Sequence, residues 1–164
     1  ENQEQYRRAQ EFAEHFPRSK GLLITGPVGT GKTHLAAAIT NELIEKLYTV
    51  MFGNITDIIS LVKSTYSRDS DETELQVIHT LTREVDLLVI DDLGKEYATE
   101  NTRAILYQII NRLNEDERPV IITTNYNSKS LKTKFGERGE AIVSRITEMT
   151  EPVIMTGEDW RLKP

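Results

Sequence analysis

The sequence contains no cysteine, which excludes disulfide bonds. The histidines, His15, His34 and His79, lie far apart, so a structural zinc site is not expected either. No apolar run approaches the roughly 18 to 20 residues that are needed to cross a bilayer, and no charged-then-apolar leader opens the chain. We therefore expect a cytoplasmic protein without a membrane partner.

Basic residues are in the minority, with 20 lysines and arginines against 26 acidic residues. The resulting net charge of −6 argues against a surface that is basic all over, which a dedicated nucleic-acid coat protein would have. A nucleic-acid contact, if the protein makes one, must be confined to a local patch.

A length of 164 residues with 38% hydrophobic residues fits one globular domain with a core of its own. We interpret residues 1–164 as a single domain, with an N-terminal helix over about residues 1–17 and the core over residues 20–156. Because the first residue is Glu1 and not methionine, we expect the chain to be a piece of a longer protein that has a further N-terminal domain.

The stretch from Gly26 to Thr33 reads GPVGTGKT and fits G-x-x-x-x-G-K-[ST], the pattern of a phosphate-binding loop. Its glycines let the backbone turn tightly and point N–H groups at phosphate oxygens. Lys32 would neutralise the β- and γ-phosphates, and the Thr33 hydroxyl would ligate Mg²⁺. A glycine-rich turn without a ligand is the alternative. We expect nucleotide contacts from Gly26, Pro27, Val28, Gly29, Thr30, Gly31, Lys32, Thr33 and His34.

Two later strands are predicted to end in polar side chains. The apolar run 85–90 does not alternate, as expected of a parallel strand covered on both faces, and it ends in Asp91 and Asp92. We assign Asp91 to the Mg²⁺ site and Asp92 to the polarisation of the attacking water; a charged strand end that faces solvent is the alternative. The run 118–124 ends at Asn125, whose amide can hydrogen-bond both the water and the γ-phosphate. A turn-forming asparagine would explain the same residue.

Five predicted strands alternate with predicted helices, and the phosphate loop follows the first strand. We therefore predict an α/β fold, a three-layer αβα P-loop NTPase with a five-stranded parallel sheet. Two helices are predicted between the second and third strands, more than a simple crossover requires. In the N-terminal helix, an apolar stripe that begins at Tyr6 can pack into the core or form a wall of an adenine pocket. The strands are expected over residues 21–25, 48–52, 85–92, 118–125 and 152–155.

The order of these motifs resembles that of the AAA+ ATPases. Within them the chain is similar to the bacterial helicase loaders of the DnaC and DnaI type and to the related IstB transposition ATPases. The resemblance implies an AAA+ fold in which the usual helical lid domain is absent or vestigial. The segments that carry it are Gly26 through Leu35, Leu87 through Gly94, Ile122 through Asn125, Gly136 through Arg138, and Ser144 through Ile146.

The resemblance also implies roles for single residues. Asp91 matches the Walker B metal aspartate, and Asn125 matches sensor 1. Asp92 stands where AAA+ proteins usually carry glutamate, and because aspartate is one methylene shorter, hydrolysis is expected to be slow. Together with Lys32 and Arg145, Asp92 and Asn125 form the expected catalytic set.

Three arginines receive roles from the resemblance alone. Arg145 matches the arginine finger, which acts in trans on the nucleotide of a neighbouring subunit. Arg138 is the second choice for this role, and a charge on a helix surface is the alternative for Arg145. Arg161 falls where loaders carry a sensor-2-like arginine that contacts the nucleotide.

The implied function is that of an ATPase that loads helicases, with ATP or ADP and Mg²⁺ as cofactors. Its expected partners are the replicative helicase, single-stranded DNA and further copies of itself through Arg145. Lys63, Tyr66 and Arg68 combine cations with an aromatic ring, which suits single-stranded DNA, although a solvated helix end is equally compatible. An IstB-like transposition ATPase, a P-loop small-molecule kinase and a non-hydrolysing adaptor controlled by nucleotide remain open.

Overall fold

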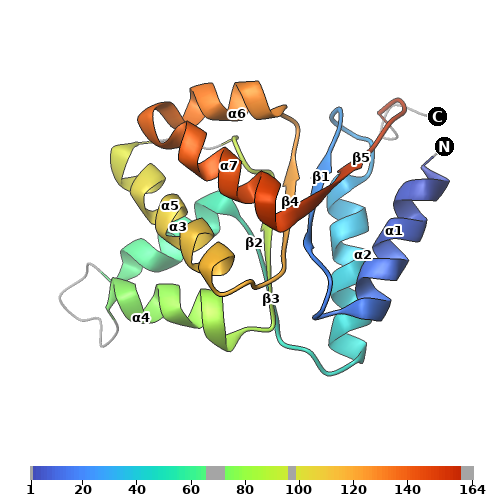
Figure 1. Ribbon diagram of the computed structural model, residues 1–164, viewed down its shortest axis with the longest axis horizontal. Coiled ribbons are helices and arrows are strands. Elements are labelled where there is room, and N and C mark those ends of the chain that lie inside the picture. The colour runs from blue at the N-terminus through green and yellow to red at the C-terminus, as the bar shows by residue number, and fades with distance from the viewer. Residues whose placement is uncertain (1, 66–72, 96–98, 160–164) are drawn as a thin grey trace.

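The computed structural model describes residues 2–65, 73–95 and 99–159, and in them five strands form one sheet (Figure 1). The order across the sheet is β2-β3-β4-β1-β5, and each neighbouring pair is parallel. The strands are β1 (Gly21–Thr25), β2 (Val50–Asn54), β3 (Leu87–Asp91), β4 (Val120–Thr124) and β5 (Thr150–Ile154).

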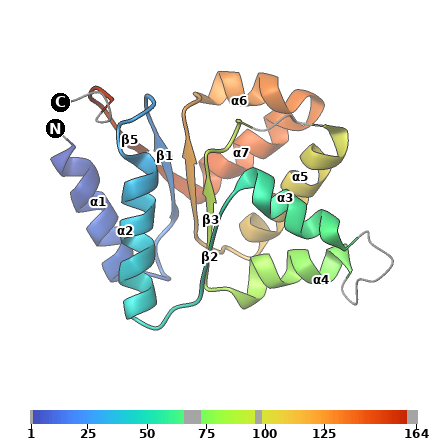
Figure 2. The same cartoon turned by 180° about the vertical axis from the view of Figure 1, so that it is seen from behind.

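Helices cover both faces of the sheet, as Figures 1 and 2 show. One face is covered by α1 (Gln3–His15) and α2 (Lys32–Glu45). The other face is covered by the later helices and has its own apolar core. Successive residues of β3 therefore point into different cores, which explains why its sequence is apolar without alternation. The later helices are α3 (Ile55–Ser64), α4 (Glu74–His79), α5 (Glu100–Glu115), α6 (Ser128–Phe135) and α7 (Gly139–Met149).

The predicted three-layer αβα fold with a five-stranded parallel sheet is confirmed, and so are the two helices between β2 and β3. The first of these helices, α3, is capped by the Asn54 side chain, which accepts the N–H of Asp57 at 2.9 Å. Helix α4 begins with a capping box between Thr73 and Gln76 and continues into a π-helical turn, η1, over Thr80–Glu84.

The bounds of every strand after the first differ from the expected ones by one or two residues. The second strand was expected over residues 48–52 but is observed over 50–54, because these residues pair with β3. Tyr48 instead packs its ring edge-on against Phe16, with the ring centroids 4.8 Å apart. Helix α7 begins at Gly139, directly after the short 3₁₀ turn η2 (Gly136–Arg138). A Cβ atom at Gly139 would lie 2.0 Å from the carbonyl oxygen of Lys132, so the glycine permits α6 and α7 to meet closely.

Helix α1 is anchored to the edge strand β5 by side chains that reach its backbone. Gln5 donates to the carbonyl of Ile154 at 2.7 Å, and Asn2 donates to that of Thr156 at 2.9 Å. The guanidinium of Arg8 donates to the carbonyl of Pro152. These bonds occupy edge carbonyls that another chain could otherwise pair with, and they fix α1 beside the phosphate loop.

The topology brings three chain segments to one edge of the sheet. Strand β4 lies between β1 and β3, so the carboxyl ends of these three strands are adjacent. The phosphate loop leaves β1, the two aspartates end β3, and Asn125 follows β4. In the part of the chain that the structure describes, none of the helices combines the length and apolar character that crossing a membrane demands.

Candidate functional site

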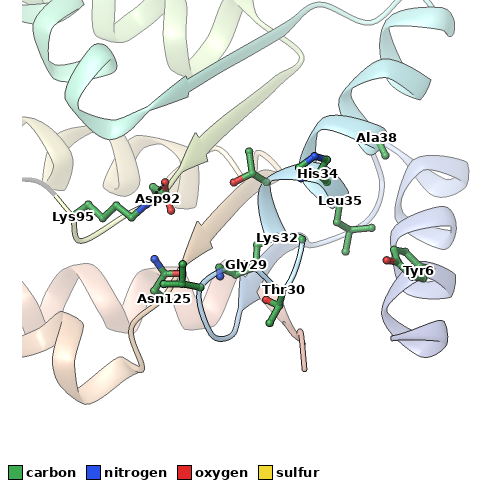
Figure 3. A pocket seen from close by; sticks show the side chains of 13 residues that line it. Tyr6, Gly29, Thr30, Lys32, His34, Leu35, Ala38, Asp92, Lys95 and Asn125 are labelled. Carbon is green, nitrogen blue, oxygen red and sulfur yellow. Dashed lines mark hydrogen bonds and ion pairs between the residues drawn. The ribbon is translucent and has the colours of Figure 1, made fainter. Parts of the chain in front are cut away.

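A cleft of about 550 Å³ opens at this edge of the sheet (Figure 3). The phosphate loop forms one side, the ends of β3 and β4 form another, and α1 faces α2 across the third. Most of the predicted nucleotide contacts lie in it. Its lining residues are Tyr6, Val28, Gly29, Thr30, Gly31, Lys32, Thr33, His34, Leu35, Ala38, Asp92, Lys95 and Asn125.

The phosphate loop is folded around the carbonyl of Pro27. The buried ammonium group of Lys32 donates to this carbonyl at 2.6 Å, and the hydroxyl of Thr30 donates to it at 2.9 Å. Helix α2 starts at Lys32, so its first free N–H groups are next to the cleft, where they favour an anion. Gly26 and Pro27, which the sequence predicted as contacts, shape the loop and do not line the cleft.

The predicted magnesium residues, Thr33 and Asp91, are hydrogen-bonded to one another. The Thr33 hydroxyl lies 3.0 and 3.1 Å from the two carboxylate oxygens of Asp91. Asp91 also accepts the hydroxyl of Thr123 at 2.6 Å, and its residue is only 8% exposed. A hydroxyl that donates to a carboxylate turns its lone pairs outward, so the donor set fits a Mg²⁺ ion.

Such an ion would need oxygen ligands from a phosphate as well. Among the described residues, no group of three His, Cys, Asp or Glu side chains is placed to hold a metal. Mg²⁺ in nucleotide sites is commonly held by one or two protein oxygens together with substrate phosphates, and the pair Thr33 and Asp91 agrees with that pattern.

Asp92 lines the cleft and has an unusual backbone conformation. Its φ of 57° is in the left-handed region, which non-glycine residues seldom adopt. Its N–H donates to the Thr123 hydroxyl at 2.9 Å, which links it to Asp91. Its carboxylate forms an ion pair with Lys95 at 2.5 Å. Lys95 was not predicted as a site residue, because a single lysine after a turn belongs to no sequence motif for nucleotide binding.

Tyr6 is set apart from the rest of the apolar stripe of α1. Its neighbours Ala9, Phe12 and Ala13 are buried in the core, whereas Tyr6 is 49% exposed and lines the cleft. In Figure 3 its ring lies across from Leu35 and Ala38 of α2. An aromatic ring opposite aliphatic carbons is a suitable wall for a planar base. Leu35 and Ala38 were not predicted, since helical spacing alone does not distinguish a cleft wall from the core.

Arg145 and Arg138 are not part of this cleft. Arg145, on α7, donates to the Asn111 side chain at 2.7 Å and to the carbonyl of Ala141 at 3.2 Å. Arg138 donates to Glu100 at 3.1 Å. Both guanidinium groups lie near the ring of Tyr107, at 5.7 Å for Arg138 and 5.1 Å for Arg145.

Of the residues predicted to contact DNA, only Lys63 is described. Its ammonium lies 3.5 Å from the Thr102 hydroxyl, at the end of α3. Tyr66 and Arg68 lie outside the described residues, and so does Arg161, the predicted nucleotide contact near the end of the chain.

Comparisons with known proteins show the family of this chain. The family model of IstB-like ATP binding proteins matches residues 7–164. The replicative helicase loader DnaC of Escherichia coli (strain K12) is 36% identical over 132 residues, which are 80% of this chain and 53% of that protein. The chain thus spans about half the length of the curated relatives it matches.

Solved structures show the same fold. A crystal structure of the DnaC helicase loader matches with a TM-score of 0.79 and 30% identity, over 91% of this chain and 86% of that one. The replication initiator DnaA bound to AMPPCP and single-stranded DNA matches with a TM-score of 0.80 and 25% identity, over 96% of this chain and 47% of that one. With its phosphate loop, paired aspartates and AAA+ fold, the chain belongs to the family of IstB-like ATP binding proteins.

Proposed function

We propose that this chain is the ATPase domain of a helicase loader, which binds the replicative helicase and single-stranded DNA under the control of ATP. The observation that carries the proposal is the meeting of the phosphate loop, Asp92 and Asn125 in one cleft, with Asp91 behind them. The similarity of this chain to DnaC, which extends over 80% of its length, also supports the proposal.

The cleft would hold ATP with its base between Tyr6 and α2 and its phosphates on the loop. The N–H groups at the start of α2 would bind phosphate oxygens, and Lys32 would offset the charge of the β- and γ-phosphates. Mg²⁺, held by Thr33 and Asp91, would neutralise charge that develops on the phosphates.

Hydrolysis would use the two side chains at the strand ends. Asp92 would orient and polarise the attacking water, and the Asn125 amide would hydrogen-bond the water and the γ-phosphate. Because an aspartate reaches less far than a glutamate, we expect slow turnover that depends on assembly. This behaviour suits a switch better than a motor.

Arg145 would complete the site of a neighbouring copy. Its guanidinium is outside the cleft of its own chain and is held by Asn111 and the ring of Tyr107. A cation outside the cleft of its own chain would act on a nucleotide that another subunit presents. Self-association and hydrolysis would then be coupled.

The main alternative is an ATPase that regulates transposition, since the matching family model is named for IstB. Such a protein would favour duplex DNA and a transposase, whereas a loader favours single strands and a helicase. A small-molecule kinase is a further alternative, for which phosphoryl transfer to a metabolite would be evidence. ATP binding without turnover in the presence of DNA would indicate a non-hydrolysing adaptor.

The test is capture of the cognate replicative helicase by the protein, with and without ATP. We expect ATP-dependent capture by the wild type and none by Lys32→Ala, together with tighter binding of single-stranded than of duplex DNA. Capture of the helicase by neither protein, combined with a preference for duplex DNA, would overturn the proposal in favour of the transposition role.

A further inference from the structure

Lys95 and Asp92 form an ion pair inside the nucleotide cleft. The ammonium of Lys95 lies 2.5 Å from Oδ2 of Asp92, and Figure 3 shows the Lys95 side chain extended toward it. Both residues line the same cleft as Lys32 and Thr33. The side chain expected to orient the attacking water is therefore already engaged by a cation.

The backbone of Asp92 and Leu93 is hydrogen-bonded to β4, which fixes the Asp92 side of this pair. The N–H of Asp92 donates to the Thr123 hydroxyl at 2.9 Å, and the N–H of Leu93 donates to the Thr123 carbonyl at 2.9 Å. The hydroxyl of Thr124 in turn donates to the carbonyl of Leu93 at 2.7 Å. The ion pair can therefore open by rotation of the Lys95 side chain, without a movement of the Asp92 backbone.

The two lysines of the cleft differ in exposure. Lys32 is buried, and its ammonium donates to a loop carbonyl. The side chain of Lys95 is 53% exposed, and ion pairs with such exposure are weak and easily exchanged. A phosphate group that carries about two negative charges attracts an ammonium more strongly than a single carboxylate does.

A γ-phosphate would also lie near Asp92, because Asp92 and Asn125 line the same cleft as the phosphate loop. Two anions brought together in this way repel one another, and a cation that binds the phosphate offsets this repulsion. Lys95 is placed to supply that cation, since it lines the cleft and already contacts one of the two anions.

We propose that Lys95 contacts the γ-phosphate of bound ATP, leaves Asp92 free to orient the water, and pairs with Asp92 again when the phosphate has gone. This inference rests on the proposed function, since it requires the cleft to bind ATP. It assigns to the chain a third residue, beside Lys32 and Asn125, that distinguishes ATP from ADP.

The test compares the affinities for AMPPCP and ADP, so that turnover does not enter. We expect Lys95→Met to weaken AMPPCP binding about tenfold, the loss typical of a hydrogen bond to a charged group, and to leave ADP binding unchanged. Lys95→Arg should restore most of the affinity. Lys129→Met on α6, outside the cleft, is the matched control and should change neither affinity.

The same comparison in the Asp92→Asn background distinguishes a direct contact of Lys95 with the phosphate from an indirect effect through Asp92. If Lys95 acts only by neutralising Asp92, Lys95→Met will have no effect on AMPPCP affinity once Asp92→Asn has removed the charge. We expect the tenfold loss to persist in the Asp92→Asn background. Its disappearance there, or equal AMPPCP affinities of wild type and Lys95→Met, would overturn the inference but not the proposed function. Failure of the wild type to bind either nucleotide would overturn both.

Discussion

The hydroxyl of Thr33 lies within hydrogen-bond distance of both carboxylate oxygens of Asp91, at 3.0 and 3.1 Å, although these residues belong to segments that follow β1 and end β3. Strand β4 separates β1 from β3 in the sheet, and its Thr123 donates to the same carboxylate at 2.6 Å. The carboxylate of Asp91 thereby connects the C-terminal ends of the three strands. The lone pairs of the Thr33 hydroxyl point away from this carboxylate, toward the place where a metal ion would bind.

Removal of the Thr33 hydroxyl should affect the metal more than the fold. We expect Thr33→Val to lower the Mg²⁺-dependent part of the ADP affinity by about tenfold to a hundredfold or more, since removal of a group that only supports a metal ligand already costs that much. Titration of the protein with ADP, once in the presence of Mg²⁺ and once in the presence of EDTA, measures this part. Thr40→Val is the control, because that hydroxyl, on the same helix, donates only to the carbonyl of Ala36 at 2.9 Å. Equal Mg²⁺ dependence in Thr33→Val and the wild type would contradict the assignment.

Lys32→Ala should abolish tight ATP binding, because it removes the buried cation of the phosphate loop. Equilibrium binding of a fluorescent ATP analogue measures the effect. Lys46→Ala, at the far end of α2, should bind as the wild type does. Retention of micromolar affinity by Lys32→Ala would be evidence against the site.

Arg145→Ala should leave ATP binding unchanged but lower turnover in assemblies, because the guanidinium lies outside its own cleft. Mixing this variant with Asp92→Asn should restore part of the phosphate release, since mixed assemblies contain sites with an intact Asp92 facing an intact Arg145. If the mixture stays inactive, the finger is Arg138 or acts within its own subunit.

Gly26→Ala should destabilise the protein by about 1 to 3 kcal/mol. Gly26 has φ +146°, and a Cβ atom there would lie 2.3 Å from the backbone carbonyl oxygen of Met155, which cannot move without a shift of the chain after β5. Urea denaturation gives the free energy of unfolding. Gly53→Ala should cost less, because its Cβ would meet only the side chain of Ile58, at 3.3 Å. Similar losses for both variants would refute the steric explanation.

The ion pair of Arg83 with Asp116 predicts a pH dependence of stability. Arg83 donates to both carboxylate oxygens of Asp116, at 2.7 and 3.0 Å, and this bonding lowers the pKa of Asp116 below its ordinary value of 3.8. A lowered pKa in the folded state stabilises the protein above pH 3.8, and this stabilisation is lost as the pH falls through the native pKa. The Tm of Asp116→Asn should therefore be lower than that of the wild type at pH 7.

The same two proteins should converge in Tm as the pH is lowered well below the ordinary pKa of the carboxyl group. The control is Glu137→Gln, an exposed acid on η2, which should follow the wild type at every pH. A Tm difference that is constant from neutral to strongly acidic pH would show that the carboxylate charge of Asp116 is not the cause.

Much of the fold could be predicted because the signals are local. The buried runs of β1, β3 and β4 are continuous apolar segments, and the loop between β1 and α2 is a fixed pattern of glycine, lysine and threonine. Parallel strands in one sheet place their carboxyl ends at one edge. The proximity of Asp92 and Asn125 to the loop therefore follows from the order of motifs.

Strand extent was less predictable. The run that begins at Tyr48 favours a strand by composition, but the observed β2 is the set of residues that pairs with β3, from Val50 against Leu87 to Asn54 against Asp91. Pairing depends on a partner that is more than thirty positions away, and the local preference is too weak to override it.

The sequence by itself determined the phosphate loop, the paired aspartates and the polar residue after the fourth strand, since each is a motif of adjacent residues. Only the tertiary structure decided which other side chains reach the cleft that these motifs form. Tyr6 lies in the cleft because α1 is bonded to β5, and Lys95 pairs with Asp92 because the backbone of Asp92 turns with positive φ. Such contacts depend on distance and orientation between elements, which residue spacing along the chain does not encode.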